Sequence, residues 1–155
     1  ADQNQVELYL IGELDLSCLT PIVRQLAIQD RIHCLPRMSR EMLTPYLQSF
    51  DLFVIPSHQE GLCIAALEAM ACGTPVVSTR CGGPEDYVIP QQTGELVDPA
   101  PEQLAGVISS ICRNRQQRDQ LAQQARQWVL EHASLDRARS NLLGQLRELF
   151  PAVAI

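Results

Sequence analysis

Short apolar runs alternate with stretches of helical periodicity along the first hundred residues of this chain. Strands are expected at residues 6–11, 31–35, 51–55, 75–78 and 94–97, and helices between them at 19–29, 39–50 and 62–72. Two neighbouring parallel strands need a crossover connection, which is usually a helix. The alternation therefore predicts an α/β fold in which helices flank a parallel sheet, and ligands of such sheets bind beyond the carboxyl ends of the strands.

Length and charge limit the classes of protein that fit this pattern. At 155 residues and 46% hydrophobic composition, the chain is expected to form one domain over 1–155, with its last helices at about 102–150. Its formal net charge is -6, and all 12 basic residues are Arg. Because binding to nucleic acid requires a basic face, no nucleic-acid partner is expected.

The cysteines point to a reducing compartment. None of the six forms a C-x-x-C pair or lies near a His at the spacing of zinc ligands, so neither a metal site nor a disulfide framework is expected. Most of them lie within apolar runs, where cysteine behaves as a small hydrophobic residue. No stretch of about 20 apolar residues is present to span a bilayer. We therefore expect a cytoplasmic protein.

Two glutamates flank the start of the expected helix 62–72. Glu60 lies in the preceding loop, and Glu68 lies inside a helix of small apolar residues, where a carboxylate needs hydrogen-bonding partners such as sugar hydroxyls. Backbone amides near Leu62, Cys63 and Ile64 would offer a positive helix end to a phosphate. Two glutamates at this spacing also fit a structural interpretation, in which Glu60 serves the helix dipole and Glu68 is solvated, and the spacing alone leaves both open.

The surrounding sequence resembles one protein family. After Glu60 come Glu68-Ala69-Met70-Ala71-Cys72-Gly73-Thr74-Pro75-Val76-Val77 and then Gly82-Gly83-Pro84-Glu85. This order resembles the donor-binding domain of family 4, or group 1, glycosyltransferases, and the likeness covers most of the chain. The resemblance implies a single Rossmann-like domain, one half of a two-domain GT-B architecture. It also implies a nucleotide-diphosphate sugar as donor, transfer of a hexosyl group with retention at the anomeric carbon, and no metal or other cofactor.

The resemblance also implies roles for individual residues. Glu60 matches the catalytic glutamate that contacts hydroxyls of the donor sugar, and Glu68 matches the one that holds the ribose. The remaining matches are Ser57 and His58 beside the diphosphate, the backbone of Gly61, Leu62, Cys63 and Ile64 beside sugar and diphosphate, and Pro36, Arg37 and Met38 in the loop that cups the base. Two departures stand out, because Cys63 and Pro36 occupy positions where the family commonly has Gly.

Part of the enzyme is expected to lie outside this chain. In the family, the Arg and Lys residues that clamp the diphosphate come from a strand and loop upstream of the matched region, and a separate N-terminal domain holds the acceptor. We therefore expect an N-terminally truncated domain that is inactive alone and that meets a membrane only through the full-length enzyme. Two alternatives stay open: a non-catalytic nucleotide-sugar-binding module, or a nucleotide-sugar epimerase of the same fold, for which His58 is the candidate titrating group.

Overall fold

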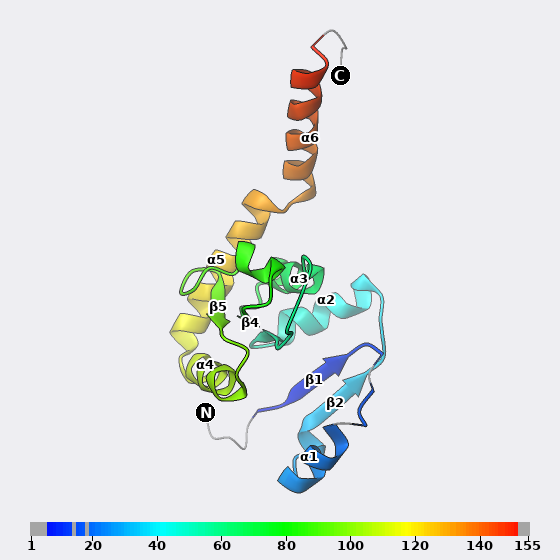
Figure 1. The fold of residues 1–155 in the computed structure, drawn as a ribbon, viewed down its shortest axis with the longest axis vertical. Coiled ribbons are helices and arrows are strands. Elements are labelled where there is room, and N and C mark those ends of the chain that lie inside the picture. Colours follow the sequence, from blue (N-terminus) through cyan, green and yellow to red (C-terminus); the bar gives the residue numbers. More distant parts are fainter. Residues whose placement is uncertain (1–5, 14, 18, 152–155) are drawn as a thin grey trace. The chain divides into compact units, whose positions relative to one another are not determined.

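The computed structural model describes residues 6–13, 15–17 and 19–151, which form two compact units. The first comprises residues up to Tyr46 and is blue to cyan in Figure 1, and the second runs from Leu47 onward and extends through green and yellow to red. Each unit is described by itself.

The first unit is built on a pair of parallel strands. Its elements are β1 (Leu8–Ile11), α1 (Leu19–Leu26), the 3-10 helix η2 (Gln29–Arg31), β2 (Ile32–Leu35) and the start of α2 (Arg40–Ser49). In the β1–β2 pair, Leu8 lies opposite Ile32 and Ile11 opposite Leu35. The Ser39 hydroxyl accepts a hydrogen bond from the Met42 amide at 3.4 Å. Ser39 therefore caps the start of α2.

The second unit contains a three-stranded parallel sheet with its middle strand buried. The strands are β3 (Phe53–Ile55), β4 (Val76–Thr79) and β5 (Gly94–Val97), in the order β3-β4-β5. Every residue of β4 is buried. The helix α3 (Ile64–Cys72) connects β3 to β4, and the 3-10 helix η3 (Gly83–Asp86) lies between β4 and β5. Two loops, one after β3 and one after β4, therefore lie at the same edge of the sheet.

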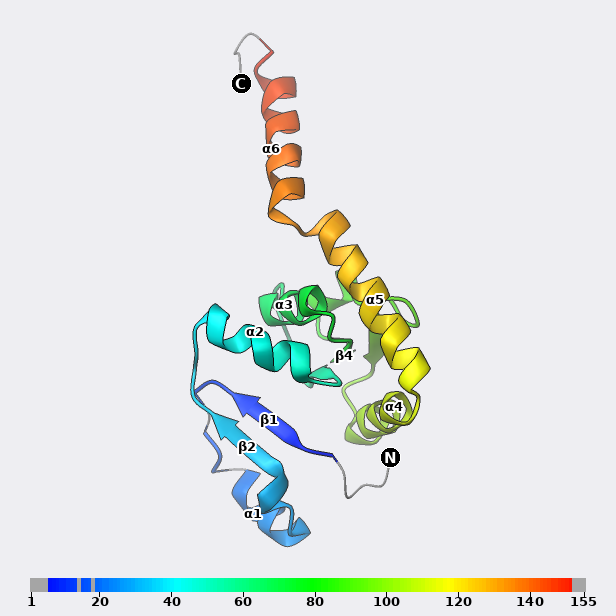
Figure 2. The same cartoon turned by 180° about the vertical axis from the view of Figure 1, so that it is seen from behind.

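Three helices complete the second unit. They are α4 (Pro101–Arg113), α5 (Arg115–His132) and α6 (Leu135–Leu149). Val77 of β4 forms the core with Ile111 of α4 and Leu121 of α5. Leu121, Ala125 and Val129 are the buried residues of α5, and their spacing of four places them on one face of the helix. None of the residues of α6, all of which the structure describes, is buried, and the helix leads away from the sheet (Figure 2).

The predicted α/β fold with parallel strands flanked by helices is confirmed, and its strands are hydrogen-bonded as two sheets, one in each unit. β5 has the predicted bounds, whereas β3 begins two residues later than expected and α3 begins at Ile64 instead of Leu62. Across the described residues, we find no helix that combines the length and the apolar character needed to cross a bilayer.

Candidate functional site

The site is formed where β3 and β4 end. The loop after β3 and the segment after β4 are joined by their backbones in a parallel bridge between Glu60 and Gly82. The Glu60 amide donates to the Cys81 carbonyl at 2.7 Å, and the Gly83 amide donates to the Glu60 carbonyl at 3.3 Å. The main chain of Glu60 is therefore fixed on both sides by residues that follow the neighbouring strand.

Two glycines allow these backbones to approach each other. A Cβ atom on Gly83 would lie 1.4 Å from the Gly61 carbonyl oxygen, and one on Gly82 would lie 2.8 Å from the Glu60 carbonyl oxygen. Gly82 also has a φ of +104°, in the region that glycine adopts far more readily than other residues. Gly82 and Gly83 therefore serve close packing and lead directly into η3.

The side chain of Glu60 is held by Ser57. The Ser57 hydroxyl donates to Oε1 of Glu60 at 2.6 Å, and both side chains are half-buried. The Ser57 carbonyl in turn accepts a hydrogen bond from the hydroxyl of Thr79, which is only 3% exposed at the end of β4. Ser57 therefore links the carboxylate of Glu60 to the central strand of the sheet.

Tyr87 supports the segment between Glu60 and α3. Its hydroxyl donates to the Leu62 carbonyl at 2.8 Å and lies 3.2 Å from the Cys63 carbonyl, and the residue is 1% exposed. Burial raises the pKa of Tyr87 above its ordinary value, so the hydroxyl stays protonated and able to donate. Sequence analysis missed this residue, because its partners lie about 25 positions earlier in the chain and no local pattern reports such a contact.

The start of α3 explains one departure from the family pattern. Cys63 is the N-cap residue and has a φ of +54°. A residue with a Cβ atom is sterically strained in this left-handed conformation, whereas glycine is not. This difference accounts for the glycine that the family pattern commonly has at this position. Burial raises the pKa of the Cys63 thiol, and the negative charge of Glu60 raises it further. The thiol is therefore neutral at ordinary pH.

Glu68 lies on the open face of α3. Ile64, Glu68 and Cys72 are spaced four residues apart and so share one face, on which Ile64 is 60% exposed and the other two are half-buried. The opposite face, with Ala66 and Ala69, is fully buried. Glu68 lies about 6 Å along the helix axis from Ile64. Glu68 therefore lies about one turn inside the helix, and because the residue is half-buried, it is partly open to solvent.

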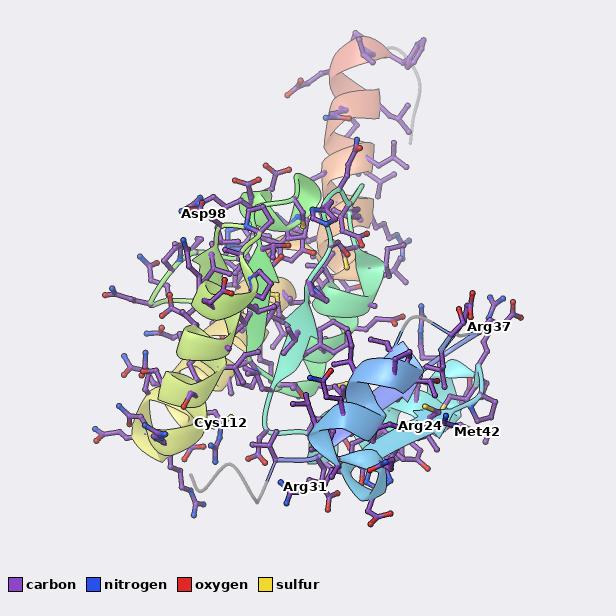
Figure 3. All side chains as sticks on the ribbon, turned by 60° about the horizontal axis from the view of Figure 1, so that its bottom comes forward. Arg24, Arg31, Arg37, Met42, Asp98 and Cys112 are labelled. Atoms are coloured by element: carbon purple, nitrogen blue, oxygen red, sulfur yellow. The ribbon has the colours of Figure 1, made fainter. Side chains whose placement is uncertain are left out.

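The remaining predicted site residues lie at the surface of their units. His58, Gly61 and Leu62 are exposed in the loop that contains Glu60. In the first unit, Pro36 and Arg37 are exposed in the segment between β2 and α2, and Met38 is half-buried. Figure 3 shows Arg37 at the surface of that unit.

Arg80, which follows β4, forms ion pairs with two carboxylates. The guanidinium of Arg80 lies 3.6 Å from a carboxylate oxygen of Glu85 and 3.7 Å from one of Asp98, so its charge is already balanced. The other oxygen of Glu85 accepts a hydrogen bond from the Gly82 amide at 3.1 Å.

Within the described ranges, no three His, Cys, Asp or Glu side chains are grouped so that they could hold a metal ion.

The comparisons with known proteins define the family. A protein-family profile described as glycosyl transferases group 1 matches residues 1–128, and the chain belongs to this family. It is 36% identical over 112 residues to a D-inositol 3-phosphate glycosyltransferase of Segniliparus rotundus, a match that covers 68% of this chain and 25% of that protein.

Solved structures show the same fold. Sucrose-phosphate synthase from Thermosynechococcus elongatus is 31% identical, with a TM-score of 0.82 over 95% of this chain and 39% of its own. An Anabaena protein crystallised with UDP-glucose is 23% identical, with a TM-score of 0.81 over 93% of this chain and 41% of its own. The fold is thus that of GT-B glycosyltransferases. The chain spans about a quarter of the length of the first relative and about two fifths of each of these two structures.

Proposed function

We propose that this chain is the donor-binding domain of a glycosyltransferase that takes a sugar from a nucleotide-diphosphate donor and transfers it with retention at the anomeric carbon. One observation supports this proposal most: the carboxylate of Glu60 is fixed immediately ahead of α3, with Glu68 one turn further along. Carboxylates in this position accept hydrogen bonds from sugar hydroxyls, and the helix start favours an anion beside them.

In the proposed complex each part of the site meets one part of the donor. Glu60 accepts hydrogen bonds from hydroxyls of the sugar, and Glu68 from those of the ribose. The backbone from Gly61 to Ile64 faces the diphosphate, because the first amides of a helix have no partner within the helix. Beside the diphosphate lies His58. The loop Pro36–Met38 encloses the base.

The proposed chemistry needs no metal. The diphosphate leaves an oxocarbenium-like carbon, and the acceptor hydroxyl attacks from the same face. Catalysis then depends on positioning and on stabilising the charge of the leaving group. The start of α3 supplies part of that stabilisation. Cationic residues from an upstream strand and loop supply the rest of that stabilisation, and a separate N-terminal domain holds the acceptor. We therefore propose that the chain alone does not turn over and meets membranes only through the whole enzyme.

The proposed site of action is the cytoplasm, and the proposed transferred group is a hexose. Cysteines at five described positions are free thiols, namely Cys34, Cys63, Cys72, Cys81 and Cys112. Free thiols support a reducing compartment. The mannosyltransferase of Mycolicibacterium hassiacum, 32% identical over 132 residues, supports the hexosyl type.

The test uses the whole protein that contains this chain, incubated with a panel of UDP-, GDP- and ADP-hexoses and analysed by mass spectrometry for transfer. Replacing Glu60 by Gln should lower kcat/KM by about tenfold to a hundredfold, since a hydrogen bond to a charged group is worth about 1.5–3 kcal/mol. Gln59→Ala, at the exposed neighbouring position, is the matched control and should change little.

Each other result has a definite meaning. Unchanged turnover in Glu60→Gln would contradict the catalytic role. Donor binding without turnover in the wild type would identify a non-catalytic module, and conversion of the donor without any acceptor would identify an epimerase. A rate that falls when EDTA is added would contradict the metal-independent mechanism.

A further inference from the structure

Ser57 has a role different from the one that the family resemblance implied. We infer that Ser57 is a positioning residue, which orients the carboxylate of Glu60 toward the donor sugar instead of binding the diphosphate. This inference rests on the proposed function, and it follows from the hydrogen bonds that Ser57 makes.

The single hydroxyl proton of Ser57 is already used. A serine hydroxyl has one proton to donate, and here it is donated to Oε1 of Glu60 at 2.6 Å. Phosphate oxygens at neutral pH are predominantly acceptors, so a diphosphate would have to compete with a carboxylate for the same proton. A hydrogen bond of this length to a charged acceptor belongs to the strong class. Ser57 is therefore engaged with Glu60 before any donor arrives.

Ser57 is itself held in place from the sheet. The Thr79 hydroxyl donates to the Ser57 carbonyl and lies 3.2 Å from the carbonyl of Ile55, at the end of β3. Thr79 is buried within β4, the middle strand of the sheet. A chain of hydrogen bonds thus runs from a rigid strand through Ser57 to a carboxylate oxygen of Glu60.

Glu60 is consequently held at both ends. Its main chain is fixed by Cys81 and Gly83, and its carboxylate is fixed by Ser57. The rotatable bonds between these ends are restricted before the donor binds, so little further side-chain entropy is lost on binding. Ser57 uses one of about four acceptor positions of the carboxylate, so the remaining ones are left to accept hydrogen bonds from sugar hydroxyls.

The test compares Ser57 variants in the whole protein, with the nucleotide sugar that the wild type uses best. Ser57→Ala should lower kcat/KM by about tenfold to a hundredfold, because displacement of a catalytic group by about 1 Å can cost about a hundredfold in rate. Ser57→Thr keeps the hydroxyl and should restore kcat/KM to within about fivefold of the wild type. Ser110→Ala, at an exposed position of α4, is the matched control and should match the wild type.

Two further measurements separate positioning from phosphate binding. The inhibition constant of the free nucleoside diphosphate should stay the same in Ser57→Ala, since Ser57 acts on the sugar through Glu60. The double variant Ser57→Ala/Glu60→Gln should be no slower than Glu60→Gln alone, because the two residues act as one unit.

Three results would overturn the inference: wild-type kcat/KM in Ser57→Ala, failure of Ser57→Thr to restore activity, or a Ser57→Ala variant that binds the nucleoside diphosphate about tenfold or more weakly. The last result would assign Ser57 to the diphosphate. A wild-type protein that neither binds nor converts any nucleotide sugar would show instead that the proposed function is wrong, and the inference with it.

Discussion

Replacing Gly83 by Ala tests whether the site depends on the close approach of two backbones. The added methyl group would lie 1.4 Å from the Gly61 carbonyl oxygen and 2.9 Å from the Leu62 Cα, and both of these atoms belong to the backbone, so no side chain can rotate away. Restoring ordinary contact requires the two segments to separate by about 2 Å.

That separation would break three hydrogen bonds that join the segments. They are Glu60 amide to Cys81 carbonyl, Gly83 amide to Glu60 carbonyl, and Tyr87 hydroxyl to Leu62 carbonyl. At about 1 kcal/mol each, their loss lowers the free energy of unfolding by about 3 kcal/mol. For a chain of this size, the melting temperature should fall by about 6–12 °C.

Thermal unfolding followed by circular dichroism measures this effect. Gly61→Ala is the matched control, because a Cβ atom there meets no heavy atom within 4 Å among the described residues, and it should melt within about 2 °C of the wild type. Gly106→Ala lies inside α4 with the same free space and should raise the free energy of unfolding by about 0.5–1 kcal/mol. A Gly83→Ala protein that melts together with the wild type would refute the reasoning.

Three further predictions concern single side chains. Tyr87→Phe keeps the buried ring but removes the hydroxyl that donates to the Leu62 carbonyl. The free energy of unfolding, measured with urea, should fall by about 1–2 kcal/mol, and an unchanged value would contradict the support described for this segment. Cys63→Gly should raise the free energy of unfolding by up to about 1 kcal/mol by relieving the left-handed backbone, whereas Cys63→Ala should not; equal effects would refute the explanation. Burial raises the pKa of Glu95, and the Gln91 amide opposes this rise only in part. The folded state therefore binds the Glu95 proton more tightly than the unfolded state, so the contribution of Glu95 to stability is present below pH 4.5 and is lost as the pH rises through the folded pKa. Glu95→Gln should thus be more stable than the wild type at pH 7, with a difference that shrinks toward pH 4 in thermal melts; a difference independent of pH would contradict the assignment.

Much of the fold could be predicted from local patterns. Gly94–Val97 was correctly predicted as a strand, and Gly73 ends α3 in the left-handed conformation typical of a helix-ending glycine. The buried face of α5, which contains Leu121 and Val129, follows the helical spacing of its apolar residues. These features depend on residues close together in the sequence.

The site was predicted less completely because its supports are distant in sequence. Glu60 and Glu68 were found from their spacing, yet the contact of Ser57 with Glu60 depends on a loop conformation that spacing does not report. Thr79 and Tyr87 lie 22 and about 25 positions from their partners. The helix start was placed two residues early, since nothing in its apolar composition revealed the left-handed conformation of Cys63.

The frame of this site is made largely of main-chain atoms, which has a consequence for how the site can change. The backbones of Glu60 and Gly82 form a bridge, and the Tyr87 hydroxyl contacts two backbone carbonyls. Neither set of contacts involves the side chains of His58, Leu62 and Ile64, which are exposed. Those three positions can therefore be randomised with little penalty to folding. Under the proposed function, a library restricted to them is a direct route to altered donor preference on an unaltered scaffold.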